Sequence, residues 1–224
     1  MILFINACVR KESRTKKLAD YLLEKWNDQY EEVRLSEVEF PLVDEEFLCR
    51  RDKLAEKRDF GDIIFDFARQ FAKADKIVIA APFWDLSFPA ALKQYLEQVN
   101  VVGITFSYTS EGVPVGLCKA KSLTYITTAG GDYFPEEYGA GYVRALAQNF
   151  YGIPEFNLIK ATGLDIDGAD IESIIAKIKI PPDTITVIYL MLSEPFCSFG
   201  GLFFVFGQYR VWNKGRCFIS LYNE

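Results

Sequence analysis

The chain of 224 residues contains no histidine. Histidine is the usual general base near neutral pH, and it completes Ser-His-Asp and Cys-His catalytic sites and H-E-x-x-H zinc sites. These classes of site are therefore excluded. An enzyme with this sequence must use carboxylates, lysine, tyrosine or cysteine for its chemistry, or must obtain that chemistry from a bound cofactor.

Cysteine and clustered positive charge are also scarce. The five cysteines are scattered and odd in number, and none of them lies in a C-x-x-C pair. This distribution favours a reducing compartment and argues against a disulfide framework or a metal site. The formal net charge is −6, and no run of lysine and arginine is long enough to contact a nucleic-acid backbone, so we expect no nucleic-acid partner.

The start of the chain lacks the features of a secretion signal. Strand-like residues begin at once, and neither a basic segment nor a cleavage site precedes them. Together with the use of cysteine, this predicts a cytoplasmic protein without a signal peptide.

Short apolar runs alternate with segments of helical periodicity as far as residue 177. The predicted strands are 2–5, 32–38, 76–81, 123–128 and 156–161. The predicted helices are 14–28, a charged surface helix at 44–59, 64–71, 87–99, 143–150 and 169–177, with a small extended excursion at 104–114. This alternation predicts an α/β fold, a doubly wound five-stranded parallel sheet in the flavodoxin-like order 2-1-3-4-5.

Three unusual loops follow the first, third and fourth predicted strands, so we expect them at the carboxyl edge of the sheet, where ligands bind in such folds. The first loop, 8–15, opens a helix and offers Ser13, Thr15 and positive charge, which suits a phosphate. Neither G-x-G-x-x-G nor G-x-x-x-x-G-K-[ST] is present, and an ordinary capped turn would use the same residue types.

The other two loops carry aromatic residues and glycines. Phe83 and Trp84 are adjacent and precede a charge, so both cannot point inward, and we interpret them as a ligand wall; the alternative is that they are core aromatics. Gly130 and Gly131 would let the backbone approach a ligand without a Cβ atom, although two glycines alone also mark a simple turn. The prediction rests on the coincidence of all three loops at one edge.

These residues resemble the FMN-dependent NAD(P)H azoreductases and quinone reductases of the flavodoxin-like superfamily. The resemblance covers about residues 1–177 and is carried by P-F-W-D-L-S-F-P-A-A-L-K (82–93), V-P-V-G-L (113–117) and T-T-A-G-G (127–131). It implies a bound FMN. The residues that it implies are Cys8, Ser13, Arg14 and Thr15 at the phosphate end, and Pro82, Phe83, Trp84, Asp85, Leu86, Thr128, Ala129, Gly130 and Gly131 along the flavin ring.

Two positions depart from the pattern of the family. Asp85 stands where the family usually has asparagine, and an ionised carboxylate accepts hydrogen bonds but donates none. Such a carboxylate would disfavour negative charge on the reduced flavin ring. Three alternatives follow: Asp85 is protonated, its side chain is turned away from the flavin, or it lowers the redox potential of the flavin. Cys8 stands where serine is common, and a thiol is the weaker donor to phosphate.

The resemblance also implies a reaction that needs no catalytic side chain. FMN accepts hydride from NADH or NADPH, the nicotinamide leaves, and a quinone or azo compound takes two electrons in the same place, which is a ping-pong mechanism. Members of the family are homodimers whose crevice is completed by the partner chain, and 44–59 is the candidate for that interface. Tyr108 and Tyr133 are expected on the substrate side, although either could be a surface tyrosine.

The resemblance ends where an apolar tail begins, so we predict an FMN-binding domain at 1–177 and a C-terminal extension at 178–224. Three interpretations of the extension are open: a poorly ordered or non-native segment, added strands at an edge or dimer contact, and a membrane tail. The last is the least favoured, because Glu194 in the middle of the apolar stretch would cost about 2.5–3.5 kcal/mol in a bilayer.

Two other functions compete with the oxidoreductase. A flavodoxin-type carrier would bind the same FMN but pass single electrons to protein partners, and the acidic sequence suits it. An α/β interaction domain that has lost flavin binding is the third candidate, for which Asp85 and Cys8 are the hints. The length of the chain, the inserted helix and the excursion around Tyr108 favour the enzyme.

Overall fold

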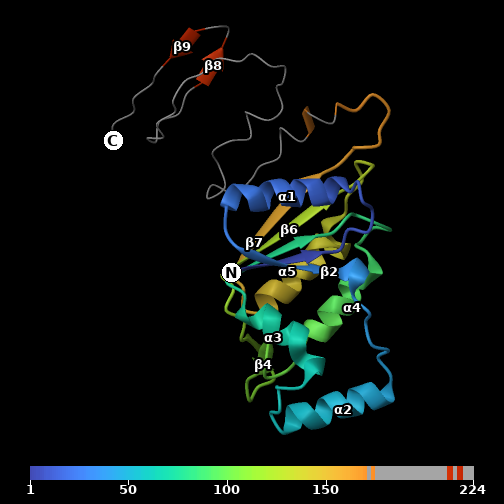
Figure 1. Cartoon of the computed structure of the whole chain (residues 1–224), viewed down its shortest axis with the longest axis vertical. Coiled ribbons are helices and arrows are strands. Elements are labelled where there is room, and N and C mark those ends of the chain that lie inside the picture. Colours follow the sequence, from blue (N-terminus) through green and yellow to red (C-terminus); the bar gives the residue numbers. More distant parts are fainter. Residues whose placement is uncertain (171–172, 175–210, 214–215, 219–224) are drawn as a thin grey trace. The chain divides into compact units, whose positions relative to one another are not determined.

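The structure is a computed structural model that describes residues 1–170, 173–174, 211–213 and 216–218. A five-stranded sheet forms its centre (Figure 1), with neighbouring strands in the order β2-β1-β3-β6-β7 and all of them parallel. The strands are β1 (Ile2–Asn6), β2 (Tyr30–Arg34), β3 (Lys76–Ala80), β6 (Ser122–Thr128) and β7 (Glu155–Ala161). The predicted order 2-1-3-4-5 is thus confirmed.

Helices cover both faces of the sheet, as Figure 1 shows, with α1 on one face and α3, α4 and α5 on the other. The helices are α1 (Arg14–Trp26), α2 (Glu45–Glu56), α3 (Asp66–Lys73), α4 (Ala90–Val99) and α5 (Ala140–Asn149). Short 3-10 helices are η1 (Leu35–Glu37), η2 (Ile63–Phe65) and η3 (Glu136–Tyr138). The strands are apolar on both faces because each face packs against helices.

Alternate residues of β1, β3, β6 and β7 enter two hydrophobic clusters. Leu3 and Ile5 of β1 pack in the cluster that includes Tyr95 of α4, whereas Ile2 and Phe4 pack in the cluster that includes Leu22 of α1. The side-chain period of two places successive residues on opposite faces. The sheet is therefore a rigid support that fixes where its loops begin.

A β-hairpin lies at the amino edge of the sheet. It consists of β4 (Phe106–Tyr108) and β5 (Pro114–Gly116), which are antiparallel, and it connects α4 to the start of β6. The backbone of Gly116 lies against the segment before β7: a Cβ atom on Gly116 would lie 2.1 Å from the backbone nitrogen of Gly152. Glycine is needed at this contact, and it holds the hairpin at the edge opposite the three predicted loops.

Several element boundaries differ from the prediction, and two of them have a clear local cause. β2 ends at Arg34 instead of continuing to residue 38, because its partner β1 ends at Asn6 and the chain turns through η1, which buries Leu35. α4 begins at Ala90 after Pro89, instead of at Ser87. The backbone of Ser87 is bonded to Trp84, and its hydroxyl donates to the carbonyl of Tyr138, so Ser87 cannot cap the helix.

The chain divides into two compact units, Met1–Leu192 and Ser193–Glu224. In the second unit the structure describes β8 (Val211–Asn213) and β9 (Arg216–Phe218), which pair as antiparallel strands. Most of the predicted helix at 169–177, and the rest of the predicted extension at 178–224, lie outside the described residues. Among the helices that are described, none combines the length and the apolar character needed to cross a membrane.

Candidate functional site

Backbone hydrogen bonds join the three predicted loops at the carboxyl edge of the sheet. The N–H of Ala7 donates to the carbonyl of Ala80 at 2.9 Å, and the N–H of Phe83 donates to the carbonyl of Thr128 at 3.0 Å. The hydroxyl groups of Thr15 and Thr128 also lie 2.7 Å apart, within hydrogen-bond distance. The loops that follow β1, β3 and β6 therefore form one continuous surface.

The first loop ends in a capped helix. Ser13 is the N-cap of α1, and its hydroxyl oxygen accepts a hydrogen bond from the N–H of Lys16 at 3.3 Å. The Ser13 hydroxyl also lies within hydrogen-bond reach of the Cys8 thiol, so it links the two ends of this loop. The first N–H groups of a helix have no partner within the helix, and the helix dipole is positive at this end. The start of α1 thus offers several donors to an anion.

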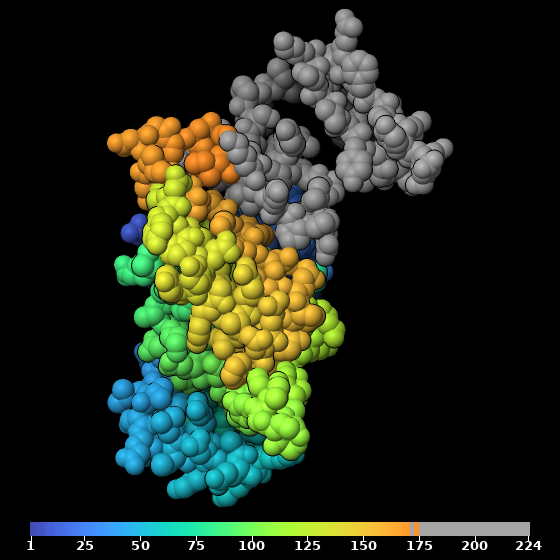
Figure 2. All heavy atoms as spheres, turned by 180° about the vertical axis from the view of Figure 1, so that it is seen from behind, coloured from blue at the N-terminus to red at the C-terminus, as the bar shows by residue number. Residues whose placement is uncertain are grey.

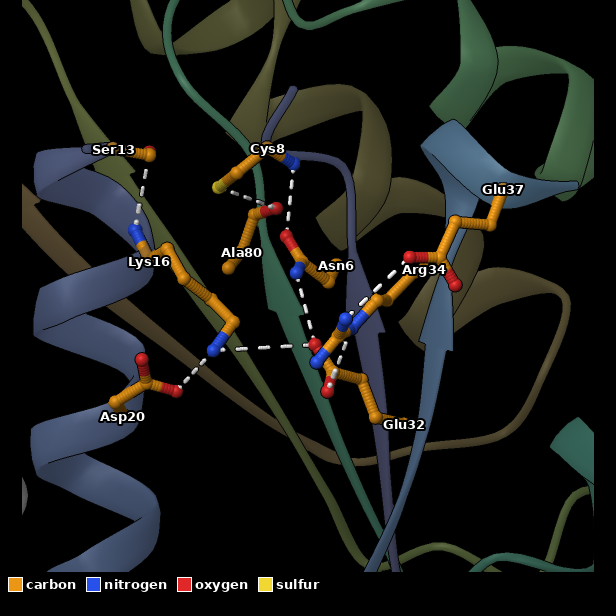
Figure 3. A network of polar contacts seen from close by, with 9 residues as sticks. All are labelled: Asn6, Cys8, Ser13, Lys16, Asp20, Glu32, Arg34, Glu37 and Ala80. Atoms are coloured by element: carbon orange, nitrogen blue, oxygen red, sulfur yellow. Dashed lines mark hydrogen bonds and ion pairs between the residues drawn. The ribbon is translucent and has the colours of Figure 1, made fainter. Parts of the chain in front are cut away.

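A polar network supports this loop from behind (Figure 3). The amide oxygen of Asn6 accepts from the N–H of Cys8 at 2.9 Å, and its amide nitrogen donates to the carboxylate of Glu32 at 2.9 Å. Arg34 and Lys16 approach the same carboxylate at 3.2 Å and 4.0 Å. Sequence reasoning missed Asn6 and Glu32. The signal for Asn6 was a polar residue at the end of a fully buried strand, and Glu32, in the middle of the edge strand β2, gave none.

The thiol of Cys8 is turned toward β3. Its sulfur donates to the carbonyl of Ala80 at 3.7 Å (Figure 3), which is a long contact even for sulfur. Burial raises the pKa of Cys8 above its ordinary value, although Ser13 and Lys16 act in the opposite direction. Cys8 is therefore a neutral thiol at pH 7, and what it offers a ligand is its place in the backbone of the loop.

The second loop contains a tight turn. Trp84 and Ser87 bond each other through their backbones, at 3.2 Å and 2.7 Å, and the two residues between them, Asp85 and Leu86, have φ values of 50° and 67°. Two successive positive φ angles are typical of a type I′ turn, in which Asp is accepted but Leu is rare. The turn leaves Trp84, Asp85 and Leu86 exposed.

Pro82 and Phe83 lie partly buried at the base of this turn. The ring of Phe83 packs against that of Phe134, with the centroids 4.5 Å apart and the planes inclined at 44°. Phe83 is thus held by an aromatic neighbour, whereas Trp84 stands on the surface. As predicted, the two adjacent rings do not both enter the core.

The third loop carries the two glycines, and the structure gives them different tasks. A Cβ atom on Gly131 would meet nothing within 4 Å, so its backbone is open to a ligand. A Cβ atom on Gly130 would lie 2.3 Å from a carboxylate oxygen of Asp165. Gly130 therefore makes room for Asp165, whereas the sequence suggested that it makes room for a ligand. Ala129, between Thr128 and Gly130, is buried.

A fourth loop, after β7, was missed by sequence reasoning. The N–H groups of Leu164 and Asp165 donate to the carbonyls of Ala129 and Gly130 at 3.2 Å and 2.9 Å. One guanidinium nitrogen of Arg14 donates to the Asp165 carboxylate at 2.7 Å and to the Leu164 carbonyl at 3.2 Å. The fourth loop thus contacts both the first loop and the third.

The two predicted substrate-side tyrosines do not lie together within one chain. Tyr133 lies in the third loop and is 75% exposed, whereas Tyr108 is 51% exposed and belongs to β4 at the amino edge of the sheet. Every residue between a helix and the next parallel strand must lie at that edge. Tyr133 is thus beside the candidate site of its own chain, and Tyr108 is not.

The donors at this edge fit the two ends of FMN. The free N–H groups of α1, the Ser13 hydroxyl and the Arg14 guanidinium suit a phosphate. The half-buried Phe83, the exposed Trp84 and the open backbone of Gly131 suit a flat ring that needs an apolar wall and a close approach.

Comparison with known proteins gives the same result. A family model described as a flavodoxin-like fold matches residues 1–179. An FMN-dependent NADH:quinone oxidoreductase of Clostridium acetobutylicum is 38% identical over 187 residues, which are 78% of this chain and 92% of that protein.

Two crystal structures of azoreductases from Bacillus anthracis also resemble the chain. One is 27% identical, with a TM-score of 0.67 over 78% of this chain and 92% of that one. The other, an FMN-dependent NADH-azoreductase in complex with FMN, is 25% identical, with a TM-score of 0.65 over 78% of this chain and 91% of that one. The chain therefore belongs to the flavodoxin-like family of FMN-dependent NADH:quinone oxidoreductases and azoreductases.

Proposed function

We propose that this protein is an enzyme that binds FMN at the carboxyl edge of its sheet and uses NADH or NADPH to reduce quinones and azo compounds. Each turnover transfers two electrons as a hydride, and the two substrates bind in turn in a ping-pong mechanism. The observation that carries the proposal is the bonding of the first, second and third loops into one surface, with Thr15 and Thr128 at its centre. When bound, FMN supplies the hydride chemistry of this reaction.

The residues of the first loop hold the phosphate in this proposal. Ser13 turns its hydroxyl group to the phosphate, Arg14 supplies a positive charge, and Thr15 contributes its backbone N–H group. The N–H of Cys8 is bonded to Asn6, so Cys8 borders the phosphate by fixing the shape of the loop. The Thr15 hydroxyl is within bonding distance of Thr128, so it holds two loops together. Because the strands below are packed on both faces, these donors are in place before the phosphate arrives.

The second and third loops hold the ring. Pro82 and Phe83 form the base of an apolar wall, and Trp84 and Leu86 extend it outward. The backbone from Thr128 to Gly131 approaches the edge of the ring. These groups orient the ring and exclude water from its face, and Tyr133 remains beside the open side, where a substrate enters. Asp85 is exposed at the tip of the turn, so solvent can screen its charge.

An absorption spectrum tests the proposal directly. The purified chain is mixed with FMN and passed through a gel-filtration column that removes free FMN. We expect flavin bands to stay with the protein, to be bleached by NADH and to return when a quinone is added. Loss of all flavin on the column would refute FMN binding. Retained flavin that NADH cannot bleach would instead favour the single-electron carrier.

We also propose that the enzyme is a homodimer in which α2 contributes to the interface. None of the residues of α2 is buried in the chain, and the segments beside it expose Leu42 (79%) and Ile63 (75%). Apolar side chains that gather on one exposed surface mark contacts between proteins, and we propose that these two belong to such a surface. In Figures 1 and 2, α2 and the hairpin of Tyr108 lie toward the same end of the first unit, so both could meet a second copy, and Tyr108 could reach the partner's crevice.

Sedimentation distinguishes this dimer from a monomer. Leu42→Asp combined with Ile63→Asp should shift the protein to monomer while the circular dichroism spectrum stays the same. The control is Ile166→Asp, which adds one negative charge, against two in the double variant, at an exposed apolar residue away from α2 and should leave the dimer intact. A wild-type chain that sediments as a monomer would contradict the proposal.

Two further proposals concern the whole chain. We propose that the flavin-binding domain ends near residue 177, which is supported by the match of the family model to residues 1–179. We also propose that the enzyme works in the cytoplasm, which is supported by the free thiols of Cys8, Cys49 and Cys118. Limited proteolysis with mass spectrometry tests the first proposal, and cell fractionation tests the second.

A further inference from the structure

The fourth loop places a carboxylate beside the donors that face the phosphate. Asp165 lies 2.7 Å from Arg14, the first residue of α1, although 151 positions separate the two residues in sequence. Their side chains are 69% and 44% exposed, so the pair lies at the surface of the site and remains accessible to a ligand.

The contact leaves half of the Arg14 guanidinium available. The same nitrogen, Nη1, donates to both Asp165 and Leu164, while Nε and Nη2 have no hydrogen-bond partner in the part of the chain that the structure describes. A guanidinium presents its five donors in a rigid fork, so fixing one side also fixes where the other side points. Arg14 can therefore hold Asp165 and an anion at the same time.

The position of Asp165 does not depend on its charge. Its N–H donates to the carbonyl of Gly130, and its carboxylate occupies the space that a Cβ atom on Gly130 would fill. Backbone contacts by Gly163 and Leu164 hold the same loop against the third loop. A side chain of equal size without charge would therefore fit in the same place.

We propose that Asp165 is a positioning residue that sets how tightly the phosphate group of the flavin is held, and hence the preference of the site for FMN over riboflavin. This inference rests on the proposed function, because it assumes that the first loop receives the phosphate. Asp165 directs the guanidinium of Arg14 and offsets its positive charge. The negative charge of Asp165 weakens the attraction between the first loop and a phosphate dianion.

Replacement of Asp165 by asparagine separates the orientation of the Arg14 guanidinium from the offset of its positive charge. Asp165→Asn keeps the size of the side chain and an oxygen that can accept from Arg14, but it removes the negative charge. We expect FMN to bind about two- to fivefold more tightly, in keeping with the modest strength of exposed ion pairs. Riboflavin, which has no phosphate, should bind with unchanged affinity. The gain for FMN should shrink as salt is added.

The experiment measures the dissociation constants of FMN and riboflavin by quenching of flavin fluorescence at low and high salt. The variants are wild type, Asp165→Asn, Arg14→Gln, the double variant and Asp167→Asn. Asp167 is exposed on the same loop and has no ion pair among the described residues, so its variant controls for net charge. We expect the preference for FMN to rise in Asp165→Asn alone and the effect to vanish when Arg14 is also replaced.

Other outcomes overturn the inference in distinguishable ways. If the preference for FMN over riboflavin rose equally in Asp167→Asn, or did not rise in Asp165→Asn, Asp165 would have no specific role at the phosphate. A parallel loss of FMN and riboflavin in Asp165→Asn would show a purely structural role. A wild-type chain that binds FMN and riboflavin equally would refute the phosphate assignment, and one that binds neither would refute the proposed function itself.

Discussion

At the scale of single residues, the turn after β3 holds a side chain in an unfavourable conformation. Leu86 has a φ of 67° and is exposed. For a residue with a Cβ atom, the left-handed region costs about 1–2 kcal/mol. Such strain gathers at sites where function fixes the conformation, which agrees with the place of Leu86 in the proposed ring wall.

Replacing Leu86 by glycine should therefore stabilise the protein and weaken flavin binding. We expect Leu86→Gly to raise the free energy of unfolding by about 0.5–1 kcal/mol, because glycine adopts the turn without strain but loses more chain entropy on folding. The affinity for FMN should fall, because the wall loses a side chain. Urea denaturation and fluorescence quenching measure the two effects.

Leu42 provides the matched control for this substitution. It is also exposed, but it is not among the residues with positive φ. At a protein concentration low enough for both variants to be monomeric, so that no contact of Leu42 with a second copy is lost, Leu42→Gly should lower the free energy of unfolding by a few tenths of a kcal/mol through the entropy of the chain. If both variants were equally destabilised, the positive φ of Leu86 would not affect the free energy of unfolding.

The residues of the site could be predicted only in part. Phe83 and Gly131 were recognisable because a turn after a buried strand and a glycine pair are local signals. Asp165 was not recognisable, because nothing near it in sequence distinguishes it from Asp167, and its importance comes from Arg14, 151 positions away. Leu86 was among the residues that the resemblance implied, but its positive φ was not recognisable, because leucine is rare in that conformation. Tyr108 lies in the β4–β5 hairpin at the opposite edge, so its predicted place on the substrate side requires a second copy of the chain.

At the scale of elements, the start of α1 and the end of β6 are joined by two hydroxyl groups. Thr15 is buried, and its hydroxyl lies 2.7 Å from that of Thr128. A buried hydrogen bond of this kind contributes about 0.5–1.5 kcal/mol, and leaving one partner unpaired costs more than removing both. The pair therefore couples two elements that form different parts of the proposed site.

A double-mutant cycle measures this coupling. Thr15→Val and Thr128→Val should each lower the free energy of unfolding by about 1 kcal/mol, and the double variant should lose less than the sum. Serine at each position keeps the hydroxyl and serves as the control. Strict additivity of the two valine variants would mean that the contact has no energetic role.

At the amino edge of the sheet, Asp75, which directly precedes β3, forms ion pairs with the segments before β1 and before β6. Its carboxylate is bonded to Lys119, at 2.6 Å, and to the amino group of Met1. The hydrogen bond from Lys119, followed by that from Met1, lowers the pKa of Asp75 from its ordinary 3.8 to about 2. A lowered pKa in the folded state means that the ionised form stabilises the fold.

This stabilisation has a defined dependence on pH. It is fully present above about pH 4 and is lost as the pH falls toward 2, through the folded-state pKa of Asp75. Asp75→Asn should therefore lower the unfolding midpoint in urea at pH 7, and the difference from wild type should narrow between pH 4 and pH 3. Asp52→Asn, at an exposed residue of α2, is the control for the loss of one negative charge. A difference that does not change with pH would contradict the assignment.

At the scale of the whole molecule, the order of the strands was predictable and their limits were less so. The apolar run at 76–81 is typical of a strand with helices on both faces, and such runs predicted four strands to within a residue or so. β2 was misplaced because it lies at an edge and alternates charged residues, which weakens the signal. The outer strands β2 and β7 both carry exposed charges, which discourages further strands from pairing with them.

The central position of β1 has a consequence for the synthesis of the protein. All five residues of β1 are buried, and its pairing places Ile2 beside Lys76, a residue made 74 positions later. At roughly 5–20 residues per second, the ribosome needs several seconds to produce β3 after β1 has been made. For that time the apolar strand β1 lacks one of its two neighbours. Ribosomes stalled just before residue 76 should therefore hold a chain that binds chaperones, and release of that binding should follow the emergence of β3.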